Sequence, residues 1–431
     1  MNHDRSIWAH CLQHAAKSDV GLRRANNQDS LAVAPAGSQD AWEHRGHVFM
    51  VADGMGAHAA GELASQIATT AVPLAYQKLA DRSPAEAILE AIGDANRQIH
   101  NRGQASPEFK GMGTTATVLV LLPQGAVLGH VGDSRAYRLR GTRLEQLTFD
   151  HSLVWEMRKA GQLPEDDVPG FISKNIITRS LGPNPAVQID LEGPFPLAVG
   201  DTFLLCSDGL SGQVKDDEIG AILATLPPEE AVQTLVDLAN LRGGPDNITV
   251  IVARVLGPQI AQGAAGGSEP AAKPPAGKPV HPAIWAVLAI FALAAVGLLV
   301  LESWLPALAC LIGAVVTALV AAISRFRDGE GRTAIDGRPL GRGPYVACDC
   351  TPNAQLVERL KDVAVQLRDA ATNEDWTVDW HRFNGHLGQA TTATGGGDFT
   401  QATREYLRAI AFMMAQLKNQ HRLGSDSAID L

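Results

Sequence analysis

An apolar run that ends on an aspartate and closely spaced glycines constrains this chain more than any other stretch. Residues 47–52 predict a buried strand, and the run ends on Asp53-Gly54-Met55-Gly56 before a helical pattern that begins at Glu62. Glycines allow a tight turn, so a backbone carbonyl and the Asp53 carboxylate can face one point. This arrangement suits a hard cation, although an isolated Asp-Gly pair after a strand is more often only a turn.

Further aspartates share the placement of Asp53, because each lies at the end of an expected strand or in the adjoining turn. They are Asp29, Asp133, Asp208 and Asp246. Converging strand ends would gather these carboxylates, and their mutual repulsion would demand cations. Oxygen ligands without histidine or cysteine favour Mg²⁺ or Mn²⁺ over zinc. Two such ions that share an aspartate can activate a water and bind a phosphoryl oxygen.

Length and composition limit the class of protein. A chain of 431 residues predicts two or three structural units. The formal net charge of -10 argues against nucleic acid as the main partner. Five scattered cysteines indicate a reducing compartment, and Cys348-Asp349-Cys350 lacks a second pair at zinc-like spacing. The polar N-terminal residues 1–17 do not resemble a signal peptide.

Six ordered motifs lie between residues 14 and 256. They are Arg24-x-x-x-Gln28-Asp29, Asp53-Gly54-Met55-Gly56-x-His58-x-x-Gly61-Glu62, Gly111-Met112-Gly113-Thr114-Thr115, Gly132-Asp133-Ser134-Arg135, Ser207-Asp208-Gly209-Leu210 and Asp246-Asn247-Ile248-Thr249-Val250. In this order they resemble the bacterial metal-dependent protein phosphatases of the PPM type, or protein phosphatase 2C. The resemblance implies an α+β fold for residues 14–256, a four-layer α-β-β-α sandwich of two antiparallel sheets flanked by helices. It also implies hydrolysis of phosphoserine and phosphothreonine in proteins by a metal-activated water, with two Mn²⁺ or Mg²⁺ ions and a weaker third.

The resemblance further implies which residues bind the metals. Asp53 would bridge two ions, and the Gly54 carbonyl would bind one of them. Asp208 and Asp246 would complete the ligands of the first ion. Asp133 would join Asp208 in binding the third ion.

Three residues take other roles under the same resemblance. Asp29 would hold a metal-bound water, and Arg24 would bind the substrate phosphate, for which a guanidinium is well shaped. His58 would be the general acid for the leaving oxygen. A surface histidine that packs on the turn is the alternative for His58.

Several positions depart from the family pattern. Gln28 stands where glutamate is usual, Ala57 stands where a third glycine is common, and residues 171–175 of a surface flap at 148–182 replace a His-Pro-x-Arg-Asn run. None of these removes a predicted metal ligand, so we expect an active enzyme that acts on phosphorylated proteins, in opposition to Ser/Thr kinases. The alternatives are a dedicated phosphatase of one stress-signalling partner and a pseudophosphatase that binds phosphoproteins without turnover.

The composition changes after the phosphatase-like part. Residues 257–282 form a Gly/Ala/Pro-rich linker, and residues 283–301 and 305–323 are apolar runs long enough to cross a bilayer. A buried soluble hairpin is the alternative. Basic residues flank the pair and are absent between the runs, which predicts a bacterial inner-membrane protein with both flanks cytoplasmic.

The last part of the chain predicts helices. A basic Gly/Arg linker at 324–344 precedes a small all-α cytoplasmic domain at 345–420. Apolar residues of one helical face recur from Leu356 to Leu367, and a last helix is expected from Phe399 to Leu417. We expect this region to bind a protein partner or to restrain the enzyme.

Overall fold

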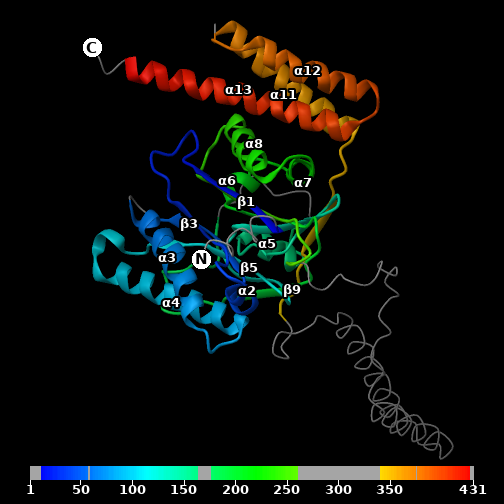
Figure 1. Cartoon of the computed structure of the whole chain (residues 1–431). Coiled ribbons are helices and arrows are strands. Elements are labelled where there is room, and N and C mark those ends of the chain that lie inside the picture. The colour runs from blue at the N-terminus through cyan, green and yellow to red at the C-terminus, as the bar shows by residue number, and fades with distance from the viewer. Residues whose placement is uncertain (1–10, 57–58, 164–175, 261–339, 375, 428–431) are drawn as a thin grey trace, which may run out of the picture. The chain divides into compact units, whose positions relative to one another are not determined.

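Strands from distant parts of the chain pair to form two antiparallel sheets (Figure 1). The computed structural model describes residues 11–56, 59–163, 176–260, 340–374 and 376–427. The first sheet has the order β1 (Leu12–Asp19), β11 (Ile248–Val255), β10 (Thr202–Cys206), β7 (Arg135–Arg140), β8 (Arg143–Gln146) and β12 (Val346–Asp349). The second has the order β2 (Asp29–Ala34), β3 (His47–Met55), β5 (Ala116–Leu122), β6 (Gly125–Val131) and β9 (Asp190–Phe195), and β4 (Gly113–Thr114) pairs with β3.

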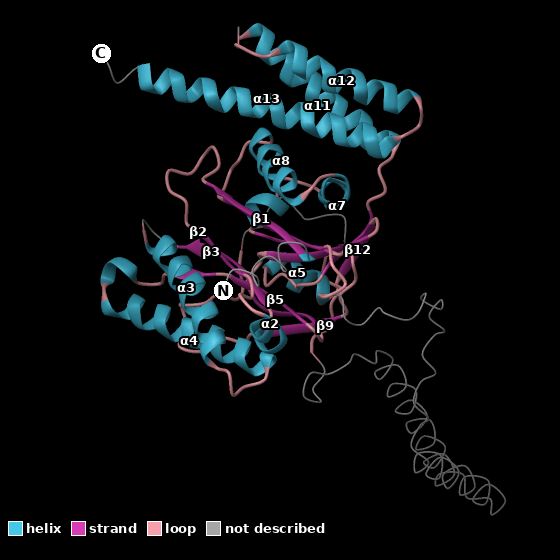
Figure 2. Cartoon of the chain, viewed as in Figure 1, coloured by secondary structure: helices cyan, strands magenta, loops and turns pink. Residues whose placement is uncertain are grey.

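Helices cover the outer faces of both sheets (Figure 2). The second sheet is covered by α3 (Ala60–Lys78) and α4 (Pro84–Ala105), whereas α7 (Asp216–Thr225) and α8 (Pro228–Leu241) cover the first. Shorter helices lie in the connections: α2 (Gln39–Arg45), η1 (Pro107–Phe109), α5 (Leu153–Lys159) and α6 (Asp208–Ser211). The predicted α-β-β-α sandwich is therefore confirmed.

The alternation of side chains along each strand builds separate cores on the two sides of a sheet. On β3, Phe49 and Val51 point into the layer between the sheets, where they join Leu205 of β10. The neighbours Val48 and Met50 belong instead to the core beneath α3 and α4. This strand is apolar on both faces because both faces are buried, which explains the uninterrupted apolar run in the sequence.

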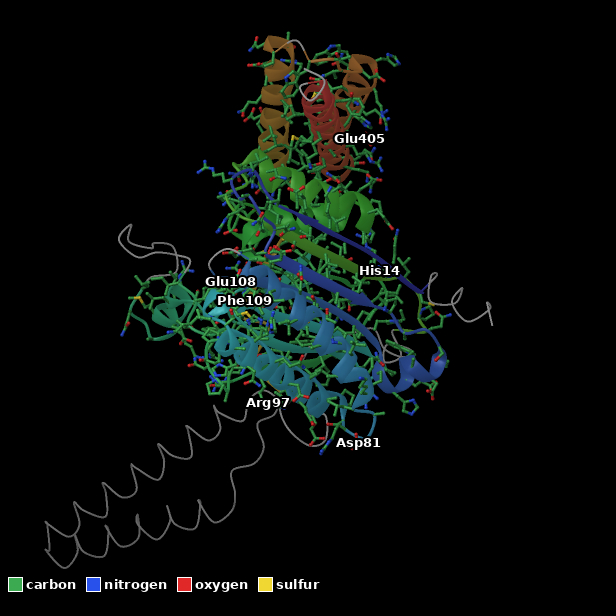
Figure 3. The ribbon with its side chains drawn as sticks, turned by 90° about the vertical axis from the view of Figure 1, so that its left-hand side faces the viewer. His14, Asp81, Arg97, Glu108, Phe109 and Glu405 are labelled. Carbon is green, nitrogen blue, oxygen red and sulfur yellow. The ribbon has the colours of Figure 1, made fainter. Side chains whose placement is uncertain are left out.

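A further layer of helices packs on α7 and α8. It consists of α11 (Ala354–Asn373), α12 (Trp380–Gly395) and α13 (Phe399–Ser427). Leu407, Ile410 and Met413 of α13 are fully buried and share one core with Leu235 of α8. Glu405, marked on α13 in Figure 3, is also buried, and its Oε2 lies 2.7 Å from Nδ1 of His386 on α12. The described parts of 1–264 and 334–431 thus form one compact unit.

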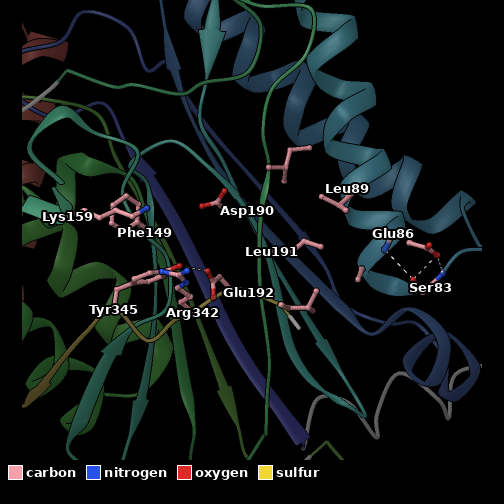
Figure 4. A pocket seen from close by; sticks show the side chains of 14 residues that line it. Ser83, Glu86, Leu89, Phe149, Lys159, Asp190, Leu191, Glu192, Arg342 and Tyr345 are labelled. Atoms are coloured by element: carbon pink, nitrogen blue, oxygen red, sulfur yellow. Dashed lines mark hydrogen bonds between the residues drawn. The ribbon is translucent and has the colours of Figure 1, made fainter. Parts of the chain in front are cut away.

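The chain re-enters this unit at Leu340 and joins the sheets before the helices begin. Leu340 bridges Gly193, and β12 pairs with β8 in the first sheet. The Gly343 amide and the Tyr345 hydroxyl donate hydrogen bonds of 2.8 and 2.5 Å to the carboxylate of Glu192. Leu340, Tyr345 and Glu192 lie on one side of a cavity of about 830 Å³, whose other side is the start of α4 (Figure 4). The sequence predicted neither β12 nor this attachment.

The predicted transmembrane hairpin requires a correction. Among the residues that the structure describes, no helix combines the length and the apolar character that crossing a bilayer requires. The predicted spans, 283–301 and 305–323, lie outside the described residues. The described fold is accordingly the sandwich with its C-terminal helices, and the predicted membrane hairpin, cell-membrane location and membrane insertion are withdrawn.

Candidate active site

Asp53 lies near the end of β3, and hydrogen bonds to the next strand hold its backbone. Its amide donates to Oγ1 of Thr115 at 2.8 Å, and its carbonyl accepts from the Thr115 amide and the Thr114 hydroxyl, each at 2.9 Å. The Gly111-Met-Gly-Thr-Thr115 motif therefore supplies the donors that fix this position. With the main chain held in this way, the carboxylate is directed by the strand and cannot relax away from its neighbours.

The glycine after Asp53 is required by the close approach of two other segments. A Cβ atom at Gly54 would lie 2.1 Å from the carbonyl oxygen of Gly61 and 2.4 Å from that of Gln28. The Gly54 amide donates to the same Gln28 oxygen at 3.1 Å. Only glycine leaves room for this packing, which brings the start of α3 and the 20–28 loop (residues 20–28) against the turn.

The other predicted aspartates come from both sheets and meet near Asp53. Asp29 is paired directly opposite Asp53 in the β2–β3 ladder. Across the sheet interface, the Ser207 hydroxyl at the end of β10 donates to Oδ2 of Asp29 at 2.7 Å. The aspartates at 133, 208 and 246 line a cleft of about 520 Å³ together with Arg24. The structure thus brings together all five aspartates that the sequence singled out.

Burial and repulsion make the ionised forms of four of these carboxyls unfavourable. Burial, with repulsion from Asp208 and Asp246, raises the pKa of Asp29 to about 7. Burial, with repulsion from Asp208 and Asp150, raises the pKa of Asp133 to about 8, and burial with repulsion from Asp246 raises that of Asp208 to about 6. Burial, followed by repulsion from its neighbours, raises the pKa of Asp53 well above the usual value. A cation would relieve this repulsion and favour the ionised forms.

The residues fit a hard divalent ion by the chemistry of their donors. The cluster offers carboxylate oxygens, and Oδ1 of Asp133 is buried without a hydrogen-bond partner among the described residues. Within the described ranges, no three acidic, histidine or cysteine side chains converge closely enough to hold an ion as they stand. The fit therefore rests on donor type, shared repulsion and the unpaired oxygen, and the carboxylates would adjust around the ions that they bind.

Arg24 lies at the rim of the same cleft and pairs with one of the predicted ligands. Its Nη2 atom donates to Oδ2 of Asp246 at 2.6 Å, and its side chain is 50% exposed. A guanidinium that is half exposed and held by a single carboxylate retains donors for an incoming anion. The neighbouring Gln28 amide donates to Oδ1 of Asn247 at 2.8 Å, which ties the loop of Arg24 to the start of β11.

The comparisons with known proteins agree with this geometry. Residues 23–238, about half of the chain, match the family described as Protein phosphatase 2C. The chain belongs to the protein phosphatase 2C family. It is 38% identical over 245 residues to a putative protein phosphatase 2C-type of Streptococcus pyogenes, covering 56% of this chain and 96% of that protein. It is 40% identical over 239 residues to protein phosphatase PhpP of Streptococcus pneumoniae, and the match covers 54% of this chain and 93% of PhpP.

Solved structures of the family superimpose on the same half of the chain. The crystal structure of the Mycobacterium tuberculosis serine/threonine phosphatase PstP/Ppp has a TM-score of 0.50 at 36% identity and covers 57% of this chain and 100% of that one. The crystal structure of Stp1 from Staphylococcus aureus has a TM-score of 0.51 at 31% identity, and the match covers 57% of this chain and 96% of Stp1. Membership of the protein phosphatase 2C family confirms the predicted enzyme class, a metal-dependent protein serine/threonine phosphatase, and the predicted Mn²⁺ or Mg²⁺ cofactor.

The structure also identifies residues of this phosphatase to which the sequence gave no role. Arg135, quoted above only as part of a motif, donates to both oxygens of Asp150 at 3.1 and 2.8 Å. Helix α5 contributes Trp155 and Arg158 to the same cleft, and the Arg135 guanidinium lies 5.7 Å from the centre of the Trp155 ring. The Nε atom of Arg158 is buried and has no hydrogen-bond partner among the described residues. No local pattern indicated this arginine, because its place in the cleft depends on how α5 folds back.

Other predictions for this site remain open. His58 and Ala57 lie outside the described residues, and so do residues 164–175, which include the whole altered run at 171–175. The general-acid role of His58 therefore stays a prediction. The same holds for the Gly54 carbonyl as a metal ligand, since the contacts described above involve its amide and its α-carbon.

Proposed function

We propose that this protein hydrolyses phosphoserine and phosphothreonine side chains of proteins at a binuclear Mn²⁺ or Mg²⁺ centre within the cluster of five aspartates. The observation that carries the proposal is the meeting of these carboxylates, from both sheets, beside the cationic side chain of Arg24. Carboxylates that repel one another without an ion are a binding site for divalent cations. The guanidinium beside them is suited to the phosphate of the substrate.

The aspartates would divide into ligands and supporting groups. Asp53, Asp208 and Asp246, with the Gly54 carbonyl, would hold the two ions, and Asp133 would share a third ion with Asp208. When bound, such ions supply a nucleophilic water at neutral pH and offset the charge that develops on the phosphoryl oxygens. The hydrogen bond from Ser207 to Oδ2 of Asp29 leaves the other Asp29 oxygen able to orient a water.

Arg24 would exchange its carboxylate partner for the substrate. In the absence of phosphate it pairs with Asp246. If Asp246 turns toward an ion, Arg24 loses this partner and its donors face the cleft. Binding of metal and binding of phosphate would therefore favour each other through this one ion pair.

The reaction transfers the phosphoryl group to water. A bond forms between the water oxygen and phosphorus, the bond from phosphorus to the serine or threonine oxygen breaks, and that oxygen takes up a proton. The products are the free hydroxyl side chain and inorganic phosphate. His58 remains the predicted proton donor.

Of the alternatives, a pseudophosphatase would be expected to have lost metal ligands. All five aspartates are retained and are buried or half-buried around one cleft, which favours turnover. A phosphatase dedicated to one stress-signalling partner would need the same site, so that alternative differs in substrate and not in chemistry.

An activity assay on the full chain tests the proposal. We expect hydrolysis of a phosphothreonine peptide with Mn²⁺ or Mg²⁺ and none in EDTA. Asp53→Asn and Asp208→Asn should each lower kcat by about 100-fold or more, because each removes a charge from the ions.

Asp40→Asn is the matched control, because Asp40 is an exposed aspartate on α2, outside the cleft. This control should retain full activity. Undiminished hydrolysis in EDTA, or in the Asp53→Asn and Asp208→Asn variants, would contradict the metal mechanism.

A further inference from the structure

The last helix contacts the phosphatase domain through two sets of charged side chains. Towards its start, Nε of Arg408 lies 2.9 Å from Oε2 of Glu230 on α8. Nearly three turns later, Lys418 reaches both α8 and the end of β1. Only the second set lies beside the loop that carries Arg24, so the two sets offer a matched comparison.

Lys418 forms an ion pair with a fully buried carboxylate. Its Nζ lies 2.9 Å from Oδ1 of Asp237, whose side chain is 0% exposed. The other oxygen of Asp237 accepts from Gln233 at 2.7 Å. Lys17 belongs to the same group of charges, and burial, followed by repulsion from Lys418, lowers its pKa. A buried carboxylate needs such a partner, so Lys418 is held at this position.

The same ammonium group lies 3.8 Å from Oδ2 of Asp19, the last residue of β1. The other Asp19 oxygen accepts from the Gly21 amide at 3.0 Å and from Nδ2 of Asn240 at 3.2 Å. Asp19 therefore joins three elements: helix α13, helix α8 and the beginning of the 20–28 loop. Its orientation decides where this loop leaves the sheet.

From Asp19 onward, the 20–28 loop is bonded to the loop before β11. The Leu22 amide donates to the Gly244 carbonyl at 2.9 Å. Asn247 donates from Nδ2 to the carbonyls of Val20 and Asn26 at 2.9 and 3.0 Å. A Cβ at Gly21 would lie 2.2 Å from the Asp246 carbonyl oxygen, so the two loops touch along their backbones. A shift at the start of one loop would therefore move the other.

The Arg24–Asp246 ion pair joins these two loops, because Arg24 lies on the 20–28 loop and Asp246 lies on the loop before β11. Arg24 is the predicted phosphate-binding residue. A continuous series of contacts thus runs from Lys418 through Asp19, Gly21 and Asp246 to Arg24. Lys418 lies well beyond residues 23–238, where the chain matches the family, so this series involves a part of the protein outside the matched region.

We propose that Lys418 is a positioning residue for the phosphate-binding loop, and that the C-terminal helices use it to set the affinity of the active site for the substrate phosphate. The inference rests on the proposed function for the role of Arg24. Docked helices hold Asp19 and favour the loop arrangement that presents Arg24. Helices that undock, or whose Lys418 is removed, leave the loop less ordered and the phosphate more weakly bound.

Two variants on the same helix test the proposal in the full chain. Lys418→Ala removes the contact with Asp19, whereas Arg408→Ala removes a charged contact of α13 that does not lead to the loop. We expect Lys418→Ala to raise KM for a phosphothreonine peptide by about three- to tenfold with kcat changed less than about twofold. Arg408→Ala should leave both values unchanged, and Lys418→Arg should restore KM.

Hydrogen exchange in the metal-free protein gives a readout that does not depend on activity. Amides of residues 20–27 should exchange faster in Lys418→Ala than in the wild type or in Arg408→Ala. Asp19→Asn serves as a second variant, because it weakens the same link without removing the partner of Asp237. If Lys418 acts through Asp19, Lys418→Ala should raise KM no further in an Asp19→Asn background.

Unchanged KM and exchange in both Lys418→Ala and Asp19→Asn, or an equal change in Arg408→Ala, would overturn the proposal. An inactive wild type would count against the proposed function, while the exchange measurement would still decide whether Lys418 orders the loop.

Discussion

The active-site cleft and the interface between α13 and α8 both gather charged side chains, but the signs of the charges differ. In the cleft, Asp246 pairs with Arg24, but neighbouring aspartates repel Asp29, Asp133 and Asp208, and burial with this repulsion raises their pKa values to between about 6 and about 8. At the interface, carboxylates face cations, as in the pairs of Arg408 with Glu230 and of Lys418 with Asp237.

The cleft therefore has uncompensated negative charge that a bound cation could neutralise, whereas the carboxylates of the interface are already neutralised by ion pairs. Repulsion among the aspartates lowers the stability of the metal-free protein, and bound cations would restore it. The interface gains nothing from an added ion, because each carboxylate named above already has a cation beside it. Like charges buried together therefore indicate binding, and opposite charges at a similar depth indicate docking.

The largest expected effect tests whether the interface and the cleft belong to one cooperative fold. Ile410→Ala removes a fully buried side chain from the core that α13 shares with α8. It should lower the free energy of unfolding by about 2–5 kcal/mol. If the helices and the sandwich unfold together, circular dichroism will show a single unfolding transition whose midpoint is lower than that of the wild type.

Leu74→Ala is the control, since Leu74 lies on α3 with 56% exposure. Its unfolding free energy should stay within about 0.5 kcal/mol of the wild type. An early transition that involves only α11–α13 in Ile410→Ala would show that the interface is a separate unit, and the comparison would then concern two independent bodies.

The next largest effect concerns how the stability of the metal-free protein depends on pH. A carboxyl whose pKa is raised on folding stabilises the protein at low pH and loses that contribution as the pH rises through the folded pKa. The carboxyls of Asp208, Asp29 and Asp133 therefore predict falling stability between about pH 6 and about pH 8. Each proton held only by the folded state contributes about 1.4 kcal/mol per pH unit.

Thermal unfolding in EDTA and in Mn²⁺ measures this loss. The rise in Tm on adding Mn²⁺ should grow from pH 6 to pH 8, because cations replace the protons that the carboxyls have lost. Asp133→Asn should reduce the pH dependence in EDTA. A Tm in EDTA that stays constant or increases over this range would mean that the aspartates do not repel one another as described.

The smallest effect adds one more charge to the cleft. Gln28→Glu places a carboxylate in the loop whose Gln28 carbonyl accepts from Gly54, beside the predicted metal turn. A unit pair at about 4 Å is worth about 4 kcal/mol at an effective dielectric constant near 20, and desolvation opposes most of it. We expect a net gain of about 1 kcal/mol, which is several-fold in metal affinity, with similar turnover at saturation.

A titration of activity with Mn²⁺ at fixed pH compares Gln28→Glu with the wild type. The half-maximal concentration should be several-fold lower for the variant. Overlapping curves would indicate that the side chain of residue 28 does not face the metals, although its backbone does contact the turn.

Local patterns in the sequence were sufficient to predict the cluster of aspartates and most of the sandwich. Each aspartate lies near an end of a strand or in the adjoining turn, and an apolar run such as 116–122 encodes a buried strand without reference to the rest of the chain. The family motifs then fixed which strand ends converge. The raised pKa values follow from that convergence and could be anticipated in direction.

The C-terminal half could not be predicted in the same way, because its placement depends on contacts across long sequence separations. Ile219, Ile222 and Leu223 of α7 are all buried, since α13 covers the side that the sheet leaves open. Nothing in the sequence of α13 identifies α8 as its neighbour. A short strand such as β12, with the polar Asp349 among its four residues, carries too little pattern to be recognised.

The return of the chain at Leu340 changes how the C-terminal helices are connected to the enzyme. Ile260 is buried where the sandwich ends, and Leu340 is buried where the chain returns to the same sheets. The described residues on either side of 261–339 therefore belong to one folded body. An edge strand and a shared core hold α11–α13 in place, so their position would not depend on covalent continuity through residues 261–339.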